Sequence, residues 1–255
     1  MSTLSHQNKF DWLLRAGDSA LVLAQRLSEW CGKGPALEED MALTNISLDL
    51  IGQATLWLSY AGSIEGKGRD EDDLAFLRDA PAFRNLLLVE QPNGDYADTL
   101  MRQLYFDAWH FFWLQSLLGS ADQQVAQIAE KSLKEVAYHL RRSSDLVIRL
   151  GDGTDESHAR MQRAADRWWM YTGECFMDDD LDHAMAEQGI APLPGSLRDR
   201  WLDRMTQVFG EASLSLPSPD SWMQSGGKQG RHSEHLGYLL AEMQFLQRAY
   251  PGAEW

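Results

Sequence analysis

The residues whose types could carry out chemistry together lie between positions 107 and 139. Asp107 and His110 stand three residues apart in YFDAWHFFWLQ, and Glu135 and His139 stand four apart in KSLKEVAYHLRRSSD. Side chains at these spacings share one face of a helix. Carboxylates and imidazoles on adjacent helices are the ligands of di-iron sites in four-helix bundles. These four residues are therefore candidate metal ligands, and a buried, hydrogen-bonded structural network is the alternative.

The full ligand set of such a site requires a carboxylate on one helix of each pair and a Glu-x-x-His step on the other. Gly52 stands three residues after Asp49, and Tyr138 stands three residues after Glu135, so neither histidine position holds an imidazole. His139 is one position further, roughly 100° around the helix. We therefore expect a vestigial site without metal and without catalytic residues, made of Glu29, Asp49, Asp107, His110, Glu135 and His139.

The elements that would position these residues are helices. Apolar spacing and turn signals predict four helices at about 10–31, 38–63, 95–118 and 120–151, the last starting at a Ser120–Gln123 capping box. Shorter helices follow at about 155–176, 180–187, 197–213 and 233–250. No series of strands is visible, so the sequence predicts one all-α domain over 1–255, with a core bundle at about 8–151 and accessory helices at about 155–255.

Composition excludes several classes of function. The net charge of -15 argues against nucleic-acid binding and against attachment to anionic membranes. No apolar run approaches the roughly 20 residues of a membrane span, and the N-terminus lacks the apolar core of a signal peptide. Cys31 and Cys175 form no CxxC pair, and we interpret them as buried thiols in a reducing cytoplasm.

Two further features have both a structural and a functional interpretation. Trp168 and Trp169 are adjacent, so their side chains diverge by about 100° and are expected not to face the same core. Core packing or a protein–protein interface would explain such aromatic residues. The run GGKQGRH at 226–232 is glycine-rich and basic, which predicts a surface loop, or a loop that touches a partner or an anionic ligand.

The chain resembles the PaaC family over nearly its whole length. The stretches that carry the likeness are LSEWCGKGPALEEDMALTNISLDLIGQA, NLLLVEQPNGDYADT, DAWH, KEVAYHLRRS, LGDGT and GGKQGRHSEHLGYLLAEMQFLQRAYPG. The resemblance implies a structural subunit of the multicomponent phenylacetyl-CoA epoxidase, with a ferritin-like fold, in a hetero-oligomer with the homologous catalytic subunit PaaA. It also implies that the di-iron centre belongs to PaaA, that an NADPH-dependent reductase supplies electrons, and that this subunit has no cofactor.

Three hypotheses for function remain open on the sequence. The first is a non-catalytic scaffold whose surplus Trp and Met residues anchor a partner. In that case Ala82, Phe83, Arg84 and Asn85, with His183, Ala184 and Met185, are expected to contact the CoA ester at the subunit junction. The second is a metal-dependent oxidase active in its own right. The third, an iron-storage protein, is disfavoured because the ligand set is incomplete.

Overall fold

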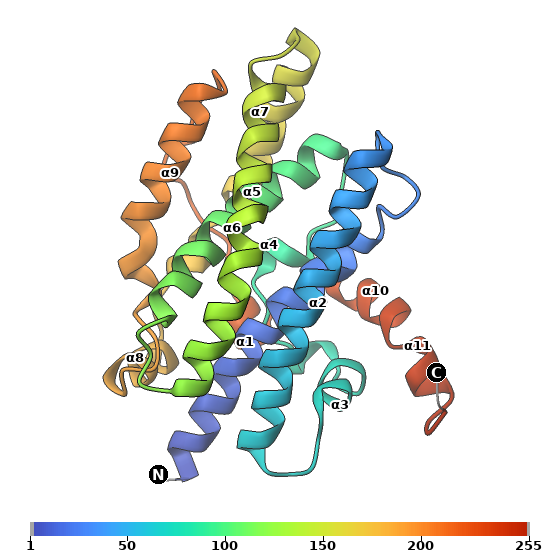
Figure 1. The fold of residues 1–255 in the computed structure, drawn as a ribbon, viewed down its shortest axis with the longest axis vertical. Coiled ribbons are helices and arrows are strands. Elements are labelled where there is room, and N and C mark those ends of the chain that lie inside the picture. Colours follow the sequence, from blue (N-terminus) through green and yellow to red (C-terminus); the bar gives the residue numbers. More distant parts are fainter. Residues whose placement is uncertain (1–2, 254–255) are drawn as a thin grey trace. The chain divides into compact units, whose positions relative to one another are not determined.

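The structure, a computed structural model, describes residues 3–253, and every regular element in that range is a helix (Figure 1). The all-α prediction is confirmed, and the helical content is consistent with a ferritin-like fold. The described part divides into two compact units, one of residues 3–92 with 226–253 and one of residues 93–225. The boundaries of these units differ from those of the expected bundle at 8–151 and the expected accessory helices at 155–255. Residues 1–2 and 254–255 of the expected single domain lie outside the described residues.

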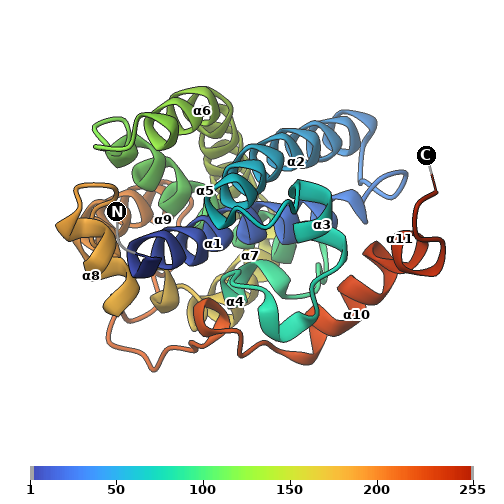
Figure 2. The same ribbon diagram turned by 90° about the horizontal axis from the view of Figure 1, so that it is seen from below.

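The first unit is built on the antiparallel pair α1 (Thr3–Ser28) and α2 (Leu37–Glu65), which lie side by side in both ribbon views (Figures 1 and 2). Gly17 allows the two helices to approach closely, since a Cβ there would lie 2.6 Å from Leu58 Cδ2. The unit also contains α3 (Glu71–Phe76), the 3₁₀ turn η1 (Ala80–Ala82) and α4 (Leu87–Glu90). The C-terminal segment adds η4 (Gly227–Gln229), α10 (Glu234–Met243) and α11 (Phe245–Ala249).

The second unit is built on the pair α5 (Tyr96–Leu117) and α6 (Gln123–Gly151), with α7 (Asp155–Trp169) packed on both. It continues through η2 (Gly173–Phe176), α8 (Asp180–Glu187), η3 (Pro194–Leu197) and α9 (Arg198–Glu211). Capping boxes start α5 at Asp95, α7 at Thr154 and α8 at Asp179. Every residue from 99 to 108 of α5 is buried, as expected for a helix that is apolar on all sides.

Several local predictions were wrong. The start of α6 is capped by Asp122, whose Oδ1 accepts from the amides of residues 124 and 125, and not by Ser120. The last predicted helix is interrupted at Gln244, whose buried side chain donates to the carbonyls of Ala75 and Arg78. Cys31 is exposed, and only Cys175 is a buried thiol.

The two adjacent tryptophans do not diverge into different environments. Trp168 and Trp169 are 2% and 3% exposed. Trp169 packs edge-on against Tyr105 and donates to the carbonyl of Ser218, whereas Trp168 donates to the carbonyl of Asp98. The segment after α9 therefore covers a side of α7 that helical geometry alone would leave exposed, and these residues need no partner chain to bury them.

Candidate functional site

Three of the predicted site residues come together inside the second unit. Asp107 and His110 on α5 are 1% and 4% exposed, and His139 on α6 is fully buried. The α5–α6 packing brings these side chains together because each points from the buried face of its helix. The carboxylate–imidazole grouping predicted from spacing therefore exists as a buried polar cluster.

Asp107 is held by hydrogen bonds in this cluster. Gln103 Nε2 donates to Asp107 Oδ1 at 2.7 Å. Burial raises the pKa of Asp107 from 3.8 to about 6, against the lowering effects of the charge of His139 and of hydrogen bonds from Ser143 and Gln103. Desolvation thus outweighs the stabilising neighbours, so this carboxyl takes up a proton more readily than an exposed aspartate.

His110 occupies an aromatic environment one turn further along α5. Its ring centroid lies 5.0 Å from that of Phe106 and 6.0 Å from that of Trp113, and its Nδ1 has no hydrogen-bond partner. Burial, together with the charge of His139, lowers the pKa of His110 to about 3. His110 is therefore a neutral imidazole packed as part of the core.

The residues at the histidine positions of the di-iron pattern do not fit the metal. Tyr138 is 44% exposed on α6, and Gly52 is exposed on α2. Glu135 is half-buried on α6. Among residues 3–253, no three His, Cys, Asp or Glu side chains form a group that could hold a metal ion. The donors present do not match the six-ligand set of a di-iron site.

The two carboxylates assigned to the first helix pair lie in a different setting from Asp107. Asp49 is half-buried on α2, within the first unit. Glu29 follows the last residue of α1, its side chain is 40% exposed, and its Oε1 lies 2.7 Å from Arg26 Nη1. Glu29 therefore belongs to a surface ion pair and not to a buried carboxylate cluster.

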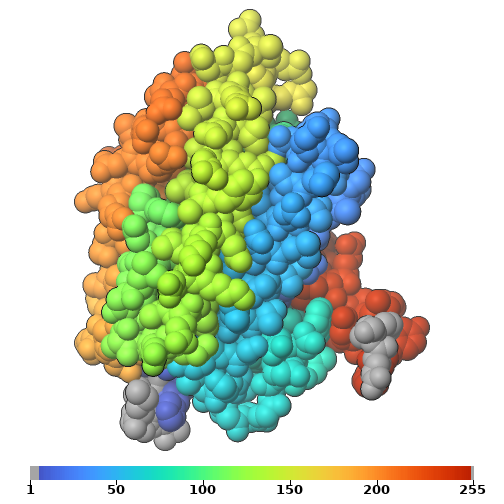
Figure 3. All heavy atoms as spheres, in the orientation of Figure 1, coloured from blue at the N-terminus to red at the C-terminus, as the bar shows by residue number. Residues whose placement is uncertain are grey.

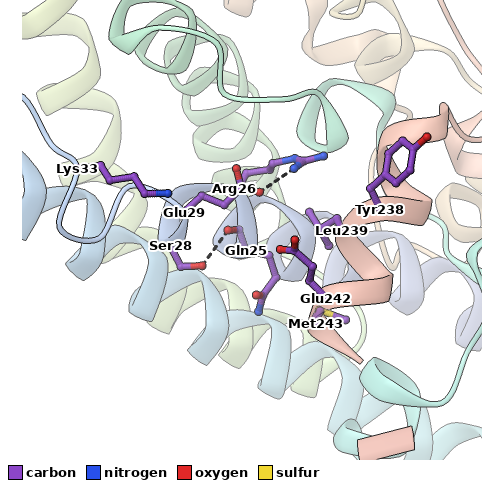
Figure 4. Close-up of a pocket in the computed structure, with 9 residues that line it drawn as sticks. All are labelled: Gln25, Arg26, Ser28, Glu29, Lys33, Tyr238, Leu239, Glu242 and Met243. Atoms are coloured by element: carbon purple, nitrogen blue, oxygen red, sulfur yellow. Dashed lines mark hydrogen bonds and ion pairs between the residues drawn. The ribbon is translucent and has the colours of Figure 1, made fainter. Parts of the chain in front are cut away.

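Glu29 lines a surface cavity of about 480 Å³ between the end of α1 and α10 (Figure 4). Figure 4 shows Lys33 and Glu29 on one side and Tyr238 and Glu242 of α10 on the other. Arg26 also lines the cavity, and its guanidinium donates to the carbonyls of residues 90 and 235. The lining carries two positive and two negative side chains. Its net charge therefore favours neither anionic nor cationic ligands.

Comparison with known proteins identifies the relatives of this chain. Residues 1–255 match the family described as phenylacetic acid catabolic protein. The chain belongs to this family. It is 51% identical over 244 residues to the C subunit of 1,2-phenylacetyl-CoA epoxidase from Escherichia coli (strain K12), which covers 96% of this chain and 98% of that protein. The resemblance seen in the sequence is thereby confirmed, and the chain has a role in phenylacetate catabolism.

In this member of the phenylacetic acid catabolic protein family, the predicted substrate contacts are only partly accessible. Phe83 and Asn85 are fully buried in the first unit, and Met185 is fully buried in the second. Arg84 is half-buried, and its guanidinium donates to the carbonyls of Pro81 and Phe83. His183 is exposed on α8. Only the accessible residues of the two segments can meet a ligand without rearrangement.

The run GGKQGRH is only in part a surface loop, since Gln229 and Arg231 are exposed and its first three residues are not. Gly226, Gly227 and Lys228 are buried, and a Cβ at Gly227 would lie 2.2 Å from the carbonyl oxygen of Asn85. Gly227 and Gly230 are therefore required for close packing of this segment on residues 81–87.

The sequence analysis did not predict a second buried carboxylate–imidazole pair, which connects residues 226–232 to α4 by hydrogen bonds. His232 Nδ1 donates to Glu90 Oε2 at 2.7 Å, and its Nε2 donates to the carbonyl of Phe83 at 3.0 Å. The amide of Ser233 and the side chain of Asn85 also donate to Glu90. The only signal in the sequence was a glutamate inside the apolar run LLLVEQ.

None of the described helices combines the length and the hydropathy that a membrane-spanning segment requires.

Proposed function

We propose that this chain is a non-catalytic structural subunit of a multicomponent phenylacetyl-CoA epoxidase. The observation that carries the proposal is the occupation of both histidine positions by Gly52 and Tyr138 in a chain that is similar to a known epoxidase subunit over nearly its full length. A carboxylate-bridged di-iron centre needs imidazole donors at those positions. The buried cluster around Asp107 then acts as part of the core that keeps the bundle folded.

The proposed assembly places the chemistry in other subunits. The homologous catalytic subunit PaaA carries the di-iron centre, and an NADPH-dependent reductase delivers electrons to it. This chain holds no cofactor, and the assembly works in the cytoplasm. Its contribution is a stable surface on which PaaA is held in its active form.

Co-expression with PaaA tests this proposal directly. We expect the two chains to co-purify as a hetero-oligomer and the epoxidation of phenylacetyl-CoA, with reductase present, to require both. PaaA alone and this chain alone are the controls. Full activity of PaaA alone at matched concentration would contradict the proposal.

A metal-dependent oxidase active in its own right is the second candidate, because a buried carboxyl with a pKa of about 6 lies near His139. It would use Asp107 and Glu135 with His110 and His139. Iron analysis of the isolated chain separates the candidates. About two iron ions per chain, with an oxo-bridge absorption band, would favour the oxidase, and iron well below one per chain supports the scaffold.

We also propose that the accessible residues of the two predicted segments, Arg84 and His183, contact the CoA ester in the assembled enzyme. An arginine suits the phosphates of coenzyme A because its guanidinium binds phosphate oxygens in pairs. Arg84→Ala should raise the KM of the assembled complex for phenylacetyl-CoA without lowering subunit affinity. Phe83→Ala is unsuitable as a test, since Phe83 is buried and its truncation would create a cavity.

A further inference from the structure

The outward face of α2 is exposed and uncharged over five helical turns. The residues on it recur at alternating spacings of four and three, and all are exposed: Met41, Asn45, Leu48, Gly52, Thr55 and Ser59. Met41 is 57% exposed and Leu48 is 60% exposed. Figure 3 shows part of α2, in blue to cyan, at the surface of the molecule.

The polar atoms of this row are largely satisfied within the chain. Thr55 Oγ1 donates to the carbonyl of Ile51 at 3.0 Å, and Ser59 Oγ donates to Glu71 Oε2 at 2.8 Å. Apart from the amide of Asn45, the face therefore presents mainly methyl groups and hydrocarbon to solvent. An ordinary solvated helix face has charged residues at such positions.

Gly52 lies at the middle of this face and has no role in the packing of the chain itself. A Cβ at this position would meet no atom within 4 Å, and Gly52 does not have a positive φ. Glycine in a helix interior is unfavourable relative to alanine. Its presence is explained if another backbone approaches α2 closely at this point.

The spacing and the charges identify what would cover the face. Alternating steps of four and three residues are the contact positions of one helix packed along another. The charged side chains along this face are acidic: Asp49 lies within its span, Glu38, Glu39 and Asp40 lie at its N-terminal end, and Glu71 accepts a hydrogen bond from Ser59 at its other end. A second copy of this chain would bring acidic residues against acidic residues along the same contact, which is unfavourable. A different chain with basic residues beside the contact would be complementary in charge to the acidic residues of α2.

We propose that the outer face of α2, from Met41 to Ser59, is the docking surface for a helix of a different protein chain. That helix presents small or apolar residues at heptad spacing, flanked by lysine or arginine. Where the partner is the catalytic subunit, this inference rests on the proposed function and locates its interface. The contact would extend over about 27 Å of α2.

The test measures the dissociation constant of the complex between this chain and PaaA. Leu48→Arg should weaken binding by about 100-fold, because it removes an apolar contact and places a positive charge among basic residues. Leu48→Glu should weaken it less, because the carboxylate can pair with those residues. Gln127→Arg, an exposed position on α6, is the matched control and should bind as the wild type does.

Gly52→Ala separates docking from folding. The melting temperature of the isolated variant should rise, because alanine favours the helix and the added Cβ meets nothing in the chain. Binding to PaaA should nevertheless weaken by about tenfold. A purely structural role for Gly52 cannot produce both results.

The outcomes distinguish failure of this inference from failure of the proposed function. If the wild-type chain does not bind PaaA, the proposed function fails. If it binds PaaA and the Leu48 and Gly52 variants bind equally well, the proposed function stands and the α2 docking surface is overturned. If the isolated chain sediments as a dimer that Leu48→Arg dissociates, the occupant is a second copy, which also overturns the proposal.

Discussion

Each compact unit contains a buried carboxylate near an imidazole, and the pKa of the histidine is shifted in opposite directions in the two units. In the first unit, Glu90 accepts hydrogen bonds from three donors, and both ring nitrogens of His232 face oxygen acceptors. In the second unit, burial raises the pKa of Asp107 to about 6, and His110 is neutral with an unpaired Nδ1. The comparison shows that burial by itself does not set the pKa of a histidine: His232 donates to a carboxylate and its pKa is raised, whereas His110 has no partner at Nδ1 and its pKa is lowered.

Truncation of Glu90 should have the largest effect. Glu90→Ala leaves the Ser233 amide and His232 Nδ1 without their acceptor and takes away one of the two acceptors of the Asn85 side chain, so we expect a loss of about 4 kcal/mol in the free energy of unfolding. Urea denaturation at pH 7 measures it. Glu29→Ala, which breaks the partly exposed ion pair with Arg26, is the control and should cost about 1 kcal/mol or less, because Arg26 keeps its hydrogen bonds to the carbonyls of Glu90 and His235. If Glu90→Ala and Glu29→Ala lowered the free energy of unfolding equally, the hydrogen bonds to Glu90 would stabilise the chain no more than the ion pair of Glu29 with Arg26.

Asp107→Asn tests whether this carboxyl destabilises the core when ionised. A carboxyl whose pKa rises from 3.8 to about 6 on folding contributes stability below pH 3.8, and that contribution is lost as pH rises through 6. The stability of the variant relative to the wild type should therefore increase by on the order of 3 kcal/mol from pH 4 to pH 7. Parallel urea titrations at several pH values measure the difference. A difference that does not change with pH would show that Asp107 titrates normally.

His110→Phe tests the neutral imidazole. A histidine whose pKa falls from 6.5 to about 3 on folding makes the chain less stable as pH falls below 6.5, because only the unfolded state takes up the proton. The variant should gain about 2 kcal/mol relative to the wild type on going from pH 7 to pH 5. Phe also fits the aromatic surroundings, so unfolding at pH 7 should change little. A parallel pH dependence in the two proteins would contradict this assignment.

The smallest expected effect is the pH dependence of the His232–Glu90 hydrogen bond, which holds residues 226–232 against α4. Burial opposes the charged form of His232, but the hydrogen bond and the charge of Glu90 outweigh it and raise its pKa. The pair therefore stabilises fully below pH 6.5, and the stabilisation is lost as pH rises through the raised pKa. Amide hydrogen exchange at residues 226–232, corrected for intrinsic rates, should show weaker protection at pH 9 than at pH 6. In His232→Gln this difference should disappear.

Much of the fold follows from local sequence signals. The boundaries of α8 agree with the predicted 180–187, and α6 ends at the predicted Gly151, because carboxylate caps and breaks in the apolar pattern act within a few residues. The break at Gln244 was not predictable, since its cause is a bond to the carbonyl of Ala75 far away in the chain. The burial of Trp169 likewise depends on residues that follow α9.

The candidate site divides in the same way. The sequence by itself predicted that Gly52 and Tyr138 occupy the histidine positions of a di-iron pattern, and the structure places both on exposed helix faces. The sequence also determined the grouping of Asp107 with His139 on neighbouring helices. Only the tertiary structure decided that Glu90 and His232 form a buried pair, since they lie 142 positions apart. Pairing of that kind depends on which distant segments exclude water together, and no local pattern encodes it.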